Sequence, residues 1–272
     1  MKPGVQQITS AQNPRVKEAV QLGRRTHRDE KGLLLVEGYR EVVRALQNGW
    51  RPASLFFCPE LYLGRNEPAL VEQAGGAGAQ LFQCAENVFR KMAYRDRPEG
   101  LLAIGPQIRL RLDDLTPRNP APLLVAAEAI EKPGNLGTIV RTAYAAGADG
   151  VIVCDECTDV NNPNVVRASI GALFSLPVVE ASSADAIEWV RSRGIQIVAA
   201  SPHAEREYTD ADLARGTAFV VGSEQYGLSE TWVKEADLCV RIQMLGQGDS
   251  LNVAAATTIL LFEAVRQRRA RR

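Results

Sequence analysis

Short apolar runs alternate with longer amphipathic stretches over the second half of the chain, and this pattern predicts a regular succession of strands and helices. Runs without polar interruption, separated by helices, are typical of a mostly parallel sheet that helices cover on both faces. Sheets of this kind bind ligands beyond the carboxyl ends of their strands. The strands are expected at 123–127, 151–154, 176–180, 195–199, 218–221 and 238–242, and the helices at 136–146, 165–173, 183–193, 229–235 and 251–268.

The first 105 residues mix shorter segments of both kinds and predict a small α/β domain. Asn13 and Pro14 open a helix that runs to about residue 22, because proline suits the first turn of a helix. Further strands are expected at 33–36, 54–58 and 101–104, and helices at 39–47 and at 68–74, where Gly75 and Gly76 end the last one. The prolines and charges that follow predict a linker. The expected organisation is therefore a domain at 1–105, a linker at 106–122 and a second domain at 123–272.

The composition agrees with two folded domains. The chain has 272 residues, of which 46% are hydrophobic and 24% charged, enough apolar surface to bury a full core. No apolar run reaches the roughly 18–20 residues of a membrane span, and the first residues lack the apolar segment of a secretory signal. Five cysteines, an odd number, do not indicate a disulfide framework. These features predict a soluble cytoplasmic protein.

Charge is balanced overall but unevenly distributed. Residues 1–106 carry 15 basic side chains against 11 acidic ones, and five arginines lie among the last seven residues. Basic clusters at both ends favour a polyanionic partner such as nucleic acid. The alternative is a solvated helix face, together with a C-terminal helix whose cations complement its dipole.

Three loops after predicted strands carry the candidate chemistry. In the first, Pro133 and Gly134 form a turn, Asn135 is expected at the N-cap of the next helix, and Arg141 follows six residues later. In the second, Gly222 and Gly227 would let backbone amides approach a ligand closely.

The carboxylate of Glu224 lies between these two glycines and would repel a phosphate, so this loop is not an anion cradle. It also matches neither the dinucleotide fingerprint nor a P-loop. The third loop runs through 242–253. There Ser250 or Asp249 is the expected N-cap, and Asn252 falls within the first turn of an otherwise alanine-rich helix. A buried asparagine needs partners, so Asn252 either fixes neighbouring loops or belongs to a capping network.

Together the three loops resemble the SpoU/TrmH family of RNA ribose 2′-O-methyltransferases, within the SPOUT superfamily. The family motif Asn-x-Gly-x-x-x-Arg matches 135–141, Gly-x-Glu-x-x-Gly matches 222–227, and Ser-Leu-Asn-Val matches 250–253. The resemblance covers roughly 123–268, and 1–105 looks like the family's substrate-binding domain, itself similar to small ribosomal RNA-binding proteins. Two positions depart from the pattern of many relatives: Gln243 replaces a proline and Ala254 a serine.

The resemblance implies a SPOUT fold with a deep C-terminal trefoil knot, S-adenosylmethionine as the cofactor, and a homodimer. It implies no metal. By position in the motifs, Arg141 would act on the target ribose while Asn135, Glu224 and Asn252 organise the site around it. The cofactor pocket would be lined by Gly222, Ile242, Leu251, Ala200 and Met244.

The chemistry of methyl transfer explains why such residues would be needed. The sulfonium methyl is already activated, so the protein has only to position and deprotonate a ribose hydroxyl. Arginine normally stays protonated, so Arg141 is expected to bind phosphate and stabilise developing negative charge. Removal of the proton is left open between a water, a phosphate and an unusual neutral arginine.

The expected activity is therefore S-adenosylmethionine-dependent 2′-O-methylation of RNA. Ribosomal RNA of the large subunit is favoured as the substrate, and neither DNA nor a membrane is expected as a partner. Two alternatives remain open: a tRNA 2′-O-methyltransferase, and a catalytically silent RNA-binding or ribosome-assembly factor on the same fold. Cys154 and Cys157 are interpreted as incidental, and His203 as a loop residue beside the pocket.

Overall fold

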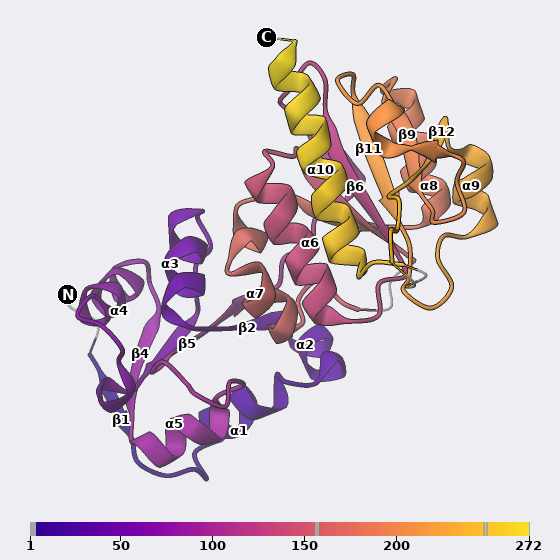
Figure 1. The fold of residues 1–272 in the computed structure, drawn as a ribbon. Coiled ribbons are helices and arrows are strands. Elements are labelled where there is room, and N and C mark those ends of the chain that lie inside the picture. The colour runs from indigo at the N-terminus through magenta and orange to yellow at the C-terminus, as the bar shows by residue number, and fades with distance from the viewer. Residues whose placement is uncertain (1–3, 156–157, 247, 249, 272) are drawn as a thin grey trace. The chain divides into compact units, whose positions relative to one another are not determined.

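The computed structural model describes residues 4–155, 158–246, 248 and 250–271. The chain forms two compact units (Figure 1). The first comprises the chain up to Ile108 and a later segment, Asn161–Ser175. The second comprises Arg109–Val160 and the chain from Leu176 onward. No helix within the described residues is both long and apolar enough to span a bilayer.

The first unit is built on a five-stranded mixed sheet with the strand order β1-β4-β3-β5-β2. Strand β5 runs antiparallel to both of its neighbours, whereas β1, β4 and β3 are parallel. The strands are β1 (Gln6–Ile8), β2 (Leu33–Glu37), β3 (Ser54–Phe57), β4 (Gln80–Cys84) and β5 (Leu101–Pro106). The helices are α1 (Pro14–Gln21), α2 (Arg25–Lys31), α3 (Tyr39–Gln47), α4 (Glu67–Gly76) and α5 (Glu86–Met92).

Helix α1 begins as expected, with the Asn13 side chain accepting a hydrogen bond from the backbone N–H of Arg15. Helix α4 differs from the prediction because it continues through Gly75 and Gly76 instead of ending before them. Buried Leu70, Val71 and Ala74 hold the helix against its unit, and this packing outweighs the low helix propensity of glycine.

The segment Asn161–Ser175 packs with the first unit, although the sequence placed it inside a continuous second domain. Arg44 of α3 donates to the carbonyl of Ile170 at 2.6 Å, and the rings of Trp50 and Phe174 lie 5.4 Å apart. The helix expected at 165–173 is α7 (Pro163–Ser169) and is shorter than predicted. It ends because Ile170 and Gly171 both adopt positive φ, which stops helical hydrogen bonding.

The second unit contains a seven-stranded sheet in which all strand pairs are parallel, as the apolar runs predict. The order is β10-β12-β9-β11-β6-β7-β8. The strands are β6 (Leu123–Glu128), β7 (Gly150–Cys154), β8 (Val178–Ala181), β9 (Gln196–Ala200), β10 (Arg206–Glu207), β11 (Thr217–Val221) and β12 (Leu238–Arg241). The helices are α6 (Pro133–Ala145), α8 (Ser183–Ser192), α9 (Glu230–Glu235) and α10 (Val253–Ala270).

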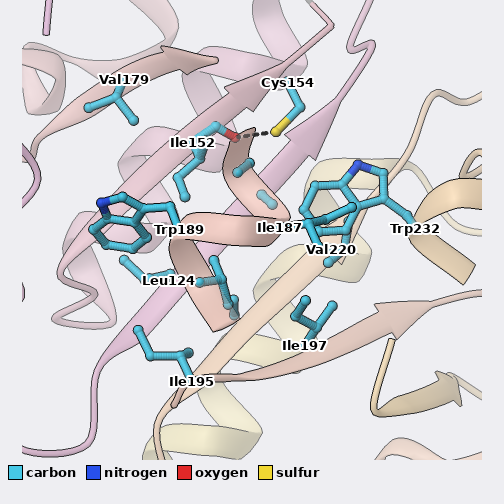
Figure 2. Close-up of a cluster of buried hydrophobic side chains, with 14 of the residues drawn as sticks. Leu124, Ile152, Cys154, Val179, Ile187, Trp189, Ile195, Ile197, Val220 and Trp232 are labelled. Atoms are coloured by element: carbon cyan, nitrogen blue, oxygen red, sulfur yellow. Dashed lines mark hydrogen bonds between the residues drawn. The ribbon is translucent and has the colours of Figure 1, made fainter. Parts of the chain in front are cut away.

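A cluster of buried apolar side chains joins this sheet to α8 and α9 (Figure 2). Trp189 and Trp232 flank the cluster on opposite sides, with strand residues such as Ile152 and Val220 between them. The indole N–H of Trp232 donates to Ser183 at 2.7 Å, so the one polar atom of this buried ring is satisfied. The other pair of helices, α6 and α10, run side by side (Figure 1).

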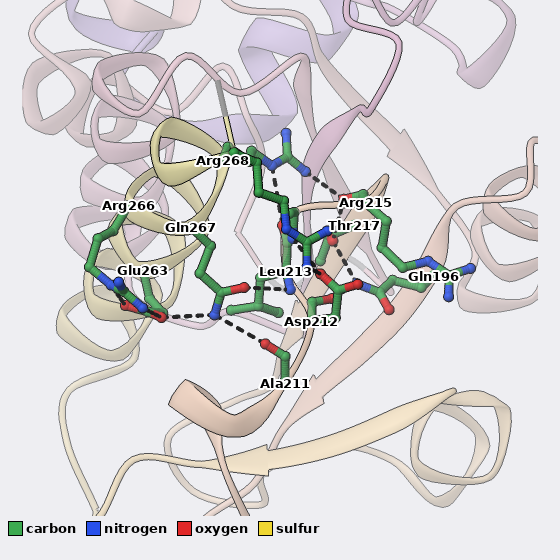
Figure 3. A network of polar contacts seen from close by, with 12 residues as sticks. Gln196, Ala211, Asp212, Leu213, Arg215, Thr217, Glu263, Arg266, Gln267 and Arg268 are labelled. Carbon is green, nitrogen blue, oxygen red and sulfur yellow. Dashed lines mark hydrogen bonds and ion pairs between the residues drawn. The ribbon is translucent and has the colours of Figure 1, made fainter.

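The C-terminal helix is held to the opposite, amino-terminal edge of the sheet by a polar network (Figure 3). The guanidinium of Arg268 donates to four backbone carbonyls, those of Ala121, Pro122, Leu213 and Arg215, at 2.7–3.2 Å. Burial lowers the pKa of Arg268. These bonds fix the end of α10 against the segments that precede β6 and β11.

Candidate active site

A cavity of about 490 Å³ lies where three neighbouring strands end. Its walls come from the segments that follow β9, β11 and β12 and from the start of α10. This is the carboxyl edge of the sheet, where parallel sheets bind ligands. Most of the lining is apolar, with contributions from Val221, Val240 and Val253, and a few polar groups such as Ser201 interrupt it.

The five residues that the sequence assigned to a cofactor pocket all line this cavity. Ala200 ends β9, Gly222 follows β11, Ile242 and Met244 follow β12, and Leu251 precedes α10. Segments far apart in the sequence therefore converge on one space. His203 also lines the cavity, as expected for a loop residue after β9.

The loop after β11 is a tight turn that closes on itself. The backbone N–H of Gly227 donates to the carbonyl of Ser223, and the Ser223 hydroxyl accepts from the N–H of Tyr226, both at 3.0 Å. Gly227 has a φ of +69°. A Cβ on Gly222 would lie 2.2 Å from the Gly227 carbonyl oxygen. A glycine is therefore required at 222 because the backbone of Gly227 lies so close. The sequence alone had attributed this glycine to the close approach of a ligand.

One residue from each of the three sequence motifs takes part in a hydrogen-bond network centred on the carboxylate of Glu224. Glu224 Oε1 accepts a hydrogen bond from Asn135 at 2.8 Å and another from Asn252 at 2.7 Å. Asn252 also donates to Asn135 Oδ1 at 3.1 Å. The network thus ties together the loop after β6, the loop after β11 and the start of α10.

The structure corrects both predicted helix caps. Asn135 is not the N-cap of α6, because the helix begins at Pro133 with Lys132 as its cap residue. Asn252 is itself the N-cap of α10, and its side-chain oxygen accepts from the backbone N–H groups of Ala254 and Ala255. Ser250 precedes that cap, and Asp249 lies outside the described residues.

Lys132 is a member of the site that the sequence reasoning missed. Its ammonium group lies 2.6 Å from Glu224 Oε2, the oxygen that the asparagines leave free. The hydrogen bond from Lys132 lowers the pKa of Glu224, and those from Asn135 and Asn252 add to it. The same contact raises the pKa of Lys132. One sign of this role was present in the sequence: Lys132 is a cation that directly precedes Pro133, three residues before the first motif begins at Asn135.

Arg141 lies apart from this network. It is exposed on α6, does not line the cavity, and makes no hydrogen bond or ion pair to another described residue. Six residues of α-helix separate it from Asn135, which turns its side chain by about 120° away from that of Asn135. Within one chain, therefore, Glu224, Asn135 and Asn252 are brought together and Arg141 is not.

The cysteines of the described residues take no part in the site. Cys154 is buried at the end of β7, where burial raises the pKa of its thiol, and Cys157 lies outside the described residues. Within the part of the chain that the structure describes, no three His, Cys, Asp or Glu side chains are grouped so as to hold a metal ion.

Two family models match this chain, one over each predicted domain. Residues 122–262 match the SpoU rRNA Methylase family, and residues 13–103 match an MRM3-like substrate binding domain. The first match contains all three motifs that meet at the cavity.

Known relatives match along nearly the whole chain. A 23S rRNA (uridine(2479)-2′-O)-methyltransferase of Streptomyces viridochromogenes is 34% identical over 98% of this chain and 94% of the relative. The 23S rRNA (guanosine(2553)-2′-O)-methyltransferase RlmP of Bacillus subtilis is 27% identical over 95% of this chain and 98% of its own length. The AdoMet-bound rRNA methyltransferase of Sinorhizobium meliloti superposes with a TM-score of 0.87 at 35% identity, covering 96% and 98% of the two chains.

Proposed function

The chain belongs to the SpoU rRNA methylase family, and we propose that it transfers a methyl group from S-adenosylmethionine to a ribose 2′-hydroxyl in 23S ribosomal RNA. The observation that carries this conclusion is the meeting of Asn135, Glu224 and Asn252 at the rim of the cavity. A chain that had lost the activity would have no reason to keep this arrangement. Relatives whose names specify 23S rRNA methylation match over almost the full length of the chain.

The cavity suits S-adenosylmethionine in size and in chemistry. Its volume falls within the range of about 300–1,000 Å³ that small-molecule sites occupy. Ile242, Leu251 and Val253 offer apolar surface for an adenine ring, and backbone groups near Gly222 offer hydrogen bonds. The cofactor supplies an activated methyl group.

The residues of the chain would then orient the ribose and hold charge. Hydrogen bonds from Lys132, Asn135 and Asn252 lower the pKa of Glu224, and these three donors hold its carboxylate in position. Arg141, with a guanidinium unused by other described residues, would bind an RNA phosphate and stabilise negative charge that develops on the ribose oxygen.

A homodimer would bring Arg141 to a second site. Tyr144 lies one turn further along α6, and both Tyr144 and Phe262 of the adjacent α10 are 46% exposed. Large apolar side chains on packed neighbouring helices form a surface suited to a second copy of the chain. Arg141 lies one turn before Tyr144 on the same helix, and we propose that it reaches the cavity of the other subunit. We place the enzyme in the cytoplasm, where ribosomal RNA is exposed to it.

The test is transfer of labelled methyl from S-adenosylmethionine to unmodified 23S rRNA, with tRNA in parallel. A 2′-O-methyl group blocks alkaline cleavage at its own nucleotide, so a cleavage ladder distinguishes ribose from base methylation. We expect label in rRNA, loss of labelling by Arg141→Ala, and full labelling by the control Lys234→Ala, an exposed lysine of α9 outside the basic clusters at the two ends of the chain.

Three other results would contradict the proposal. Label in tRNA alone would assign a different substrate. Binding of rRNA without cofactor binding or transfer would favour a silent assembly factor. Full activity of Arg141→Ala would remove the role given to Arg141.

A further inference from the structure

The loop that carries Glu224 also presents an aromatic ring to solvent. Tyr226 occupies one of the three unspecified positions of the second motif, two residues after Glu224. Its side chain is 79% exposed, compared with 46% for Tyr144 and Phe262. The same residue lines the cavity. A large aromatic side chain therefore stands in solvent at the rim of the site.

The backbone holds this ring in place. The N–H of Tyr226 itself is bonded to the Ser223 hydroxyl, and the next residue, Gly227, closes the turn onto the Ser223 carbonyl. Ser223 is 7% exposed and serves as the buried base of the turn. The two ends of the turn lie close together, since a Cβ on Gly222 would be 2.2 Å from the Gly227 carbonyl oxygen. The position of Tyr226 beside Glu224 is thus a property of the fold.

Other exposed apolar side chains gather around the same opening. Leu251 lines the cavity and is 36% exposed, and Leu245, beside the lining residue Met244, is 92% exposed. Single exposed apolar residues are common, but several on loops that border one cavity form a contact surface. Its aromatic member lies next to the charged network that Lys132 and Glu224 form.

An unpaired RNA base fits this surface. Single-stranded RNA is bound by stacking its bases on aromatic side chains, and the base of a nucleotide lies next to its own ribose. If the ribose hydroxyl is held near Glu224, as the proposed function requires, the base attached to it reaches Tyr226. We infer that Tyr226 stacks on the base of the nucleotide that is methylated. Because every base has a π face, this contact would accept either uridine or guanosine, the two bases named for the relatives.

The first test distinguishes stacking by the Tyr226 ring from the effect of side-chain size and from an effect on the chemical step. Tyr226→Leu keeps apolar bulk without a π face, whereas Tyr226→Phe and Tyr226→Trp keep the ring. We expect Tyr226→Leu to raise the KM for 23S rRNA about tenfold with kcat and cofactor Kd unchanged. The Phe and Trp variants are expected to stay within about twofold of the wild type.

The second test reads the contact directly. Tyr226→p-azidophenylalanine is irradiated with 23S rRNA in the full-length protein, and primer extension maps the cross-link. We expect the cross-link at the nucleotide that carries the new 2′-O-methyl group. A cross-link elsewhere would overturn the inference.

The remaining outcomes separate this inference from the function on which it rests. Wild-type KM for Tyr226→Leu in an active enzyme overturns the stacking role and leaves the proposed function intact. A loss of cofactor affinity in Tyr226→Leu would assign the ring to the cofactor instead. Absence of any transfer to rRNA by the wild type overturns both.

Discussion

Asn252 uses one side chain for two purposes. Its oxygen caps α10 by accepting from two backbone N–H groups, and its amide nitrogen donates to Glu224 and Asn135. An N-cap residue has a fixed backbone conformation, so the cap also fixes where the amide nitrogen points. Serine and aspartate can cap a helix equally well, but aspartate has no donor, and serine has only a hydroxyl on a shorter side chain in place of the amide N–H groups. The dual demand explains an asparagine at this position.

Two substitutions separate the two purposes. Asn252→Ala is expected to lower the free energy of unfolding by about 1 kcal/mol, because the cap is lost. Asn252→Ser keeps a capping oxygen and is expected to stay within about 0.5 kcal/mol of the wild type. Both remove the amide nitrogen that donates to Glu224 and Asn135, so both should lose methyl transfer. Urea denaturation and the transfer assay measure the two effects, and an active Asn252→Ser enzyme would show that the donor is dispensable.

Lys132 is the largest cause of the lowered pKa of Glu224. Replacing it in Lys132→Met is expected to raise the pKa of Glu224 toward its ordinary value of 4.5, since the largest cause of the lowering is removed. NMR titration of the Glu224 carboxyl carbon measures this. Lys234→Met, which breaks a comparable exposed pair with Glu230, is the control and should leave Glu224 unchanged.

The same pair gives stability a defined dependence on pH. The folded pKa of Glu224 is lowered, so its contribution is complete above pH 4.5 and is lost as pH falls through the lowered pKa. The folded pKa of Lys132 is raised, so its contribution is complete below pH 10.5 and is lost as pH rises through the raised value. The stability difference between wild type and Lys132→Met should therefore be constant inside this window. A difference that does not shrink as the pH is lowered below 4.5 would contradict the assignment.

At the scale of elements, helix α10 runs from the carboxyl edge of the parallel sheet, where the cavity lies, to its amino-terminal edge. Its first residue follows the Asn252 cap at the cavity, and its last turn is bound by Arg268 to the loops at the opposite edge. Gln267 adds a donor to the carbonyl of Ala211 and accepts from the N–H of Leu213. The helix is thereby fixed at both ends, which keeps Asn252 in register with Glu224.

Removing the C-terminal anchor should destabilise the second unit. Arg268→Met preserves the apolar stem but leaves four carbonyls without this donor, and we expect a loss of about 2 kcal/mol of unfolding free energy. Arg269→Met changes an exposed neighbour and should be neutral. Thermal denaturation compares the two, and equal midpoints would show that the network adds nothing to stability.

At the scale of the whole molecule, the chain passes from the second unit to the first and back. The segment Asn161–Ser175 contributes helix α7 and the ring of Phe174 to the first unit, where the ring lies near Trp50. Gly171 lies so close to α3 that a Cβ there would be 3.0 Å from the Arg44 side chain. The first unit therefore depends on residues that come after β7 in the chain.

This dependence predicts where mutations act. Phe174→Ala is expected to lower the stability of the first unit by about 2 kcal/mol, because the ring is half-buried. Amide hydrogen exchange should show the loss in β3 and β5 and not in β6 and β7. Ile187→Ala, in the core of the second unit, should show the converse. Faster exchange of both units in either variant would mean that they unfold together.

Secondary structure could be predicted where the apolar pattern is strong. Helix α3 has the predicted bounds, and β6, β7 and β11 lie within one residue of them, because buried parallel strands require continuous apolar runs. Helix α2 was missed because its sequence, Arg-Thr-His-Arg-Asp-Glu-Lys, has no apolar periodicity. Its tertiary anchor is a charged residue, since Arg28 is buried and donates to the carbonyls of Leu22 and Gly23. The trefoil knot and the limits of the linker at 106–122 stay predictions.

The sequence by itself determined the parallel sheet and the position of the site at the carboxyl ends of its strands, and the resemblance of its motifs to a known family supplied Asn135, Glu224 and Asn252. These follow from local patterns, since apolar runs, turns and short motifs are properties of neighbouring residues. Only the tertiary structure decided that Lys132 pairs with Glu224, that Asn252 is a cap, that Arg141 stands apart and that Asn161–Ser175 packs with the first unit. Each of these depends on which distant segments meet, and packing energy between segments is not encoded in any one of them.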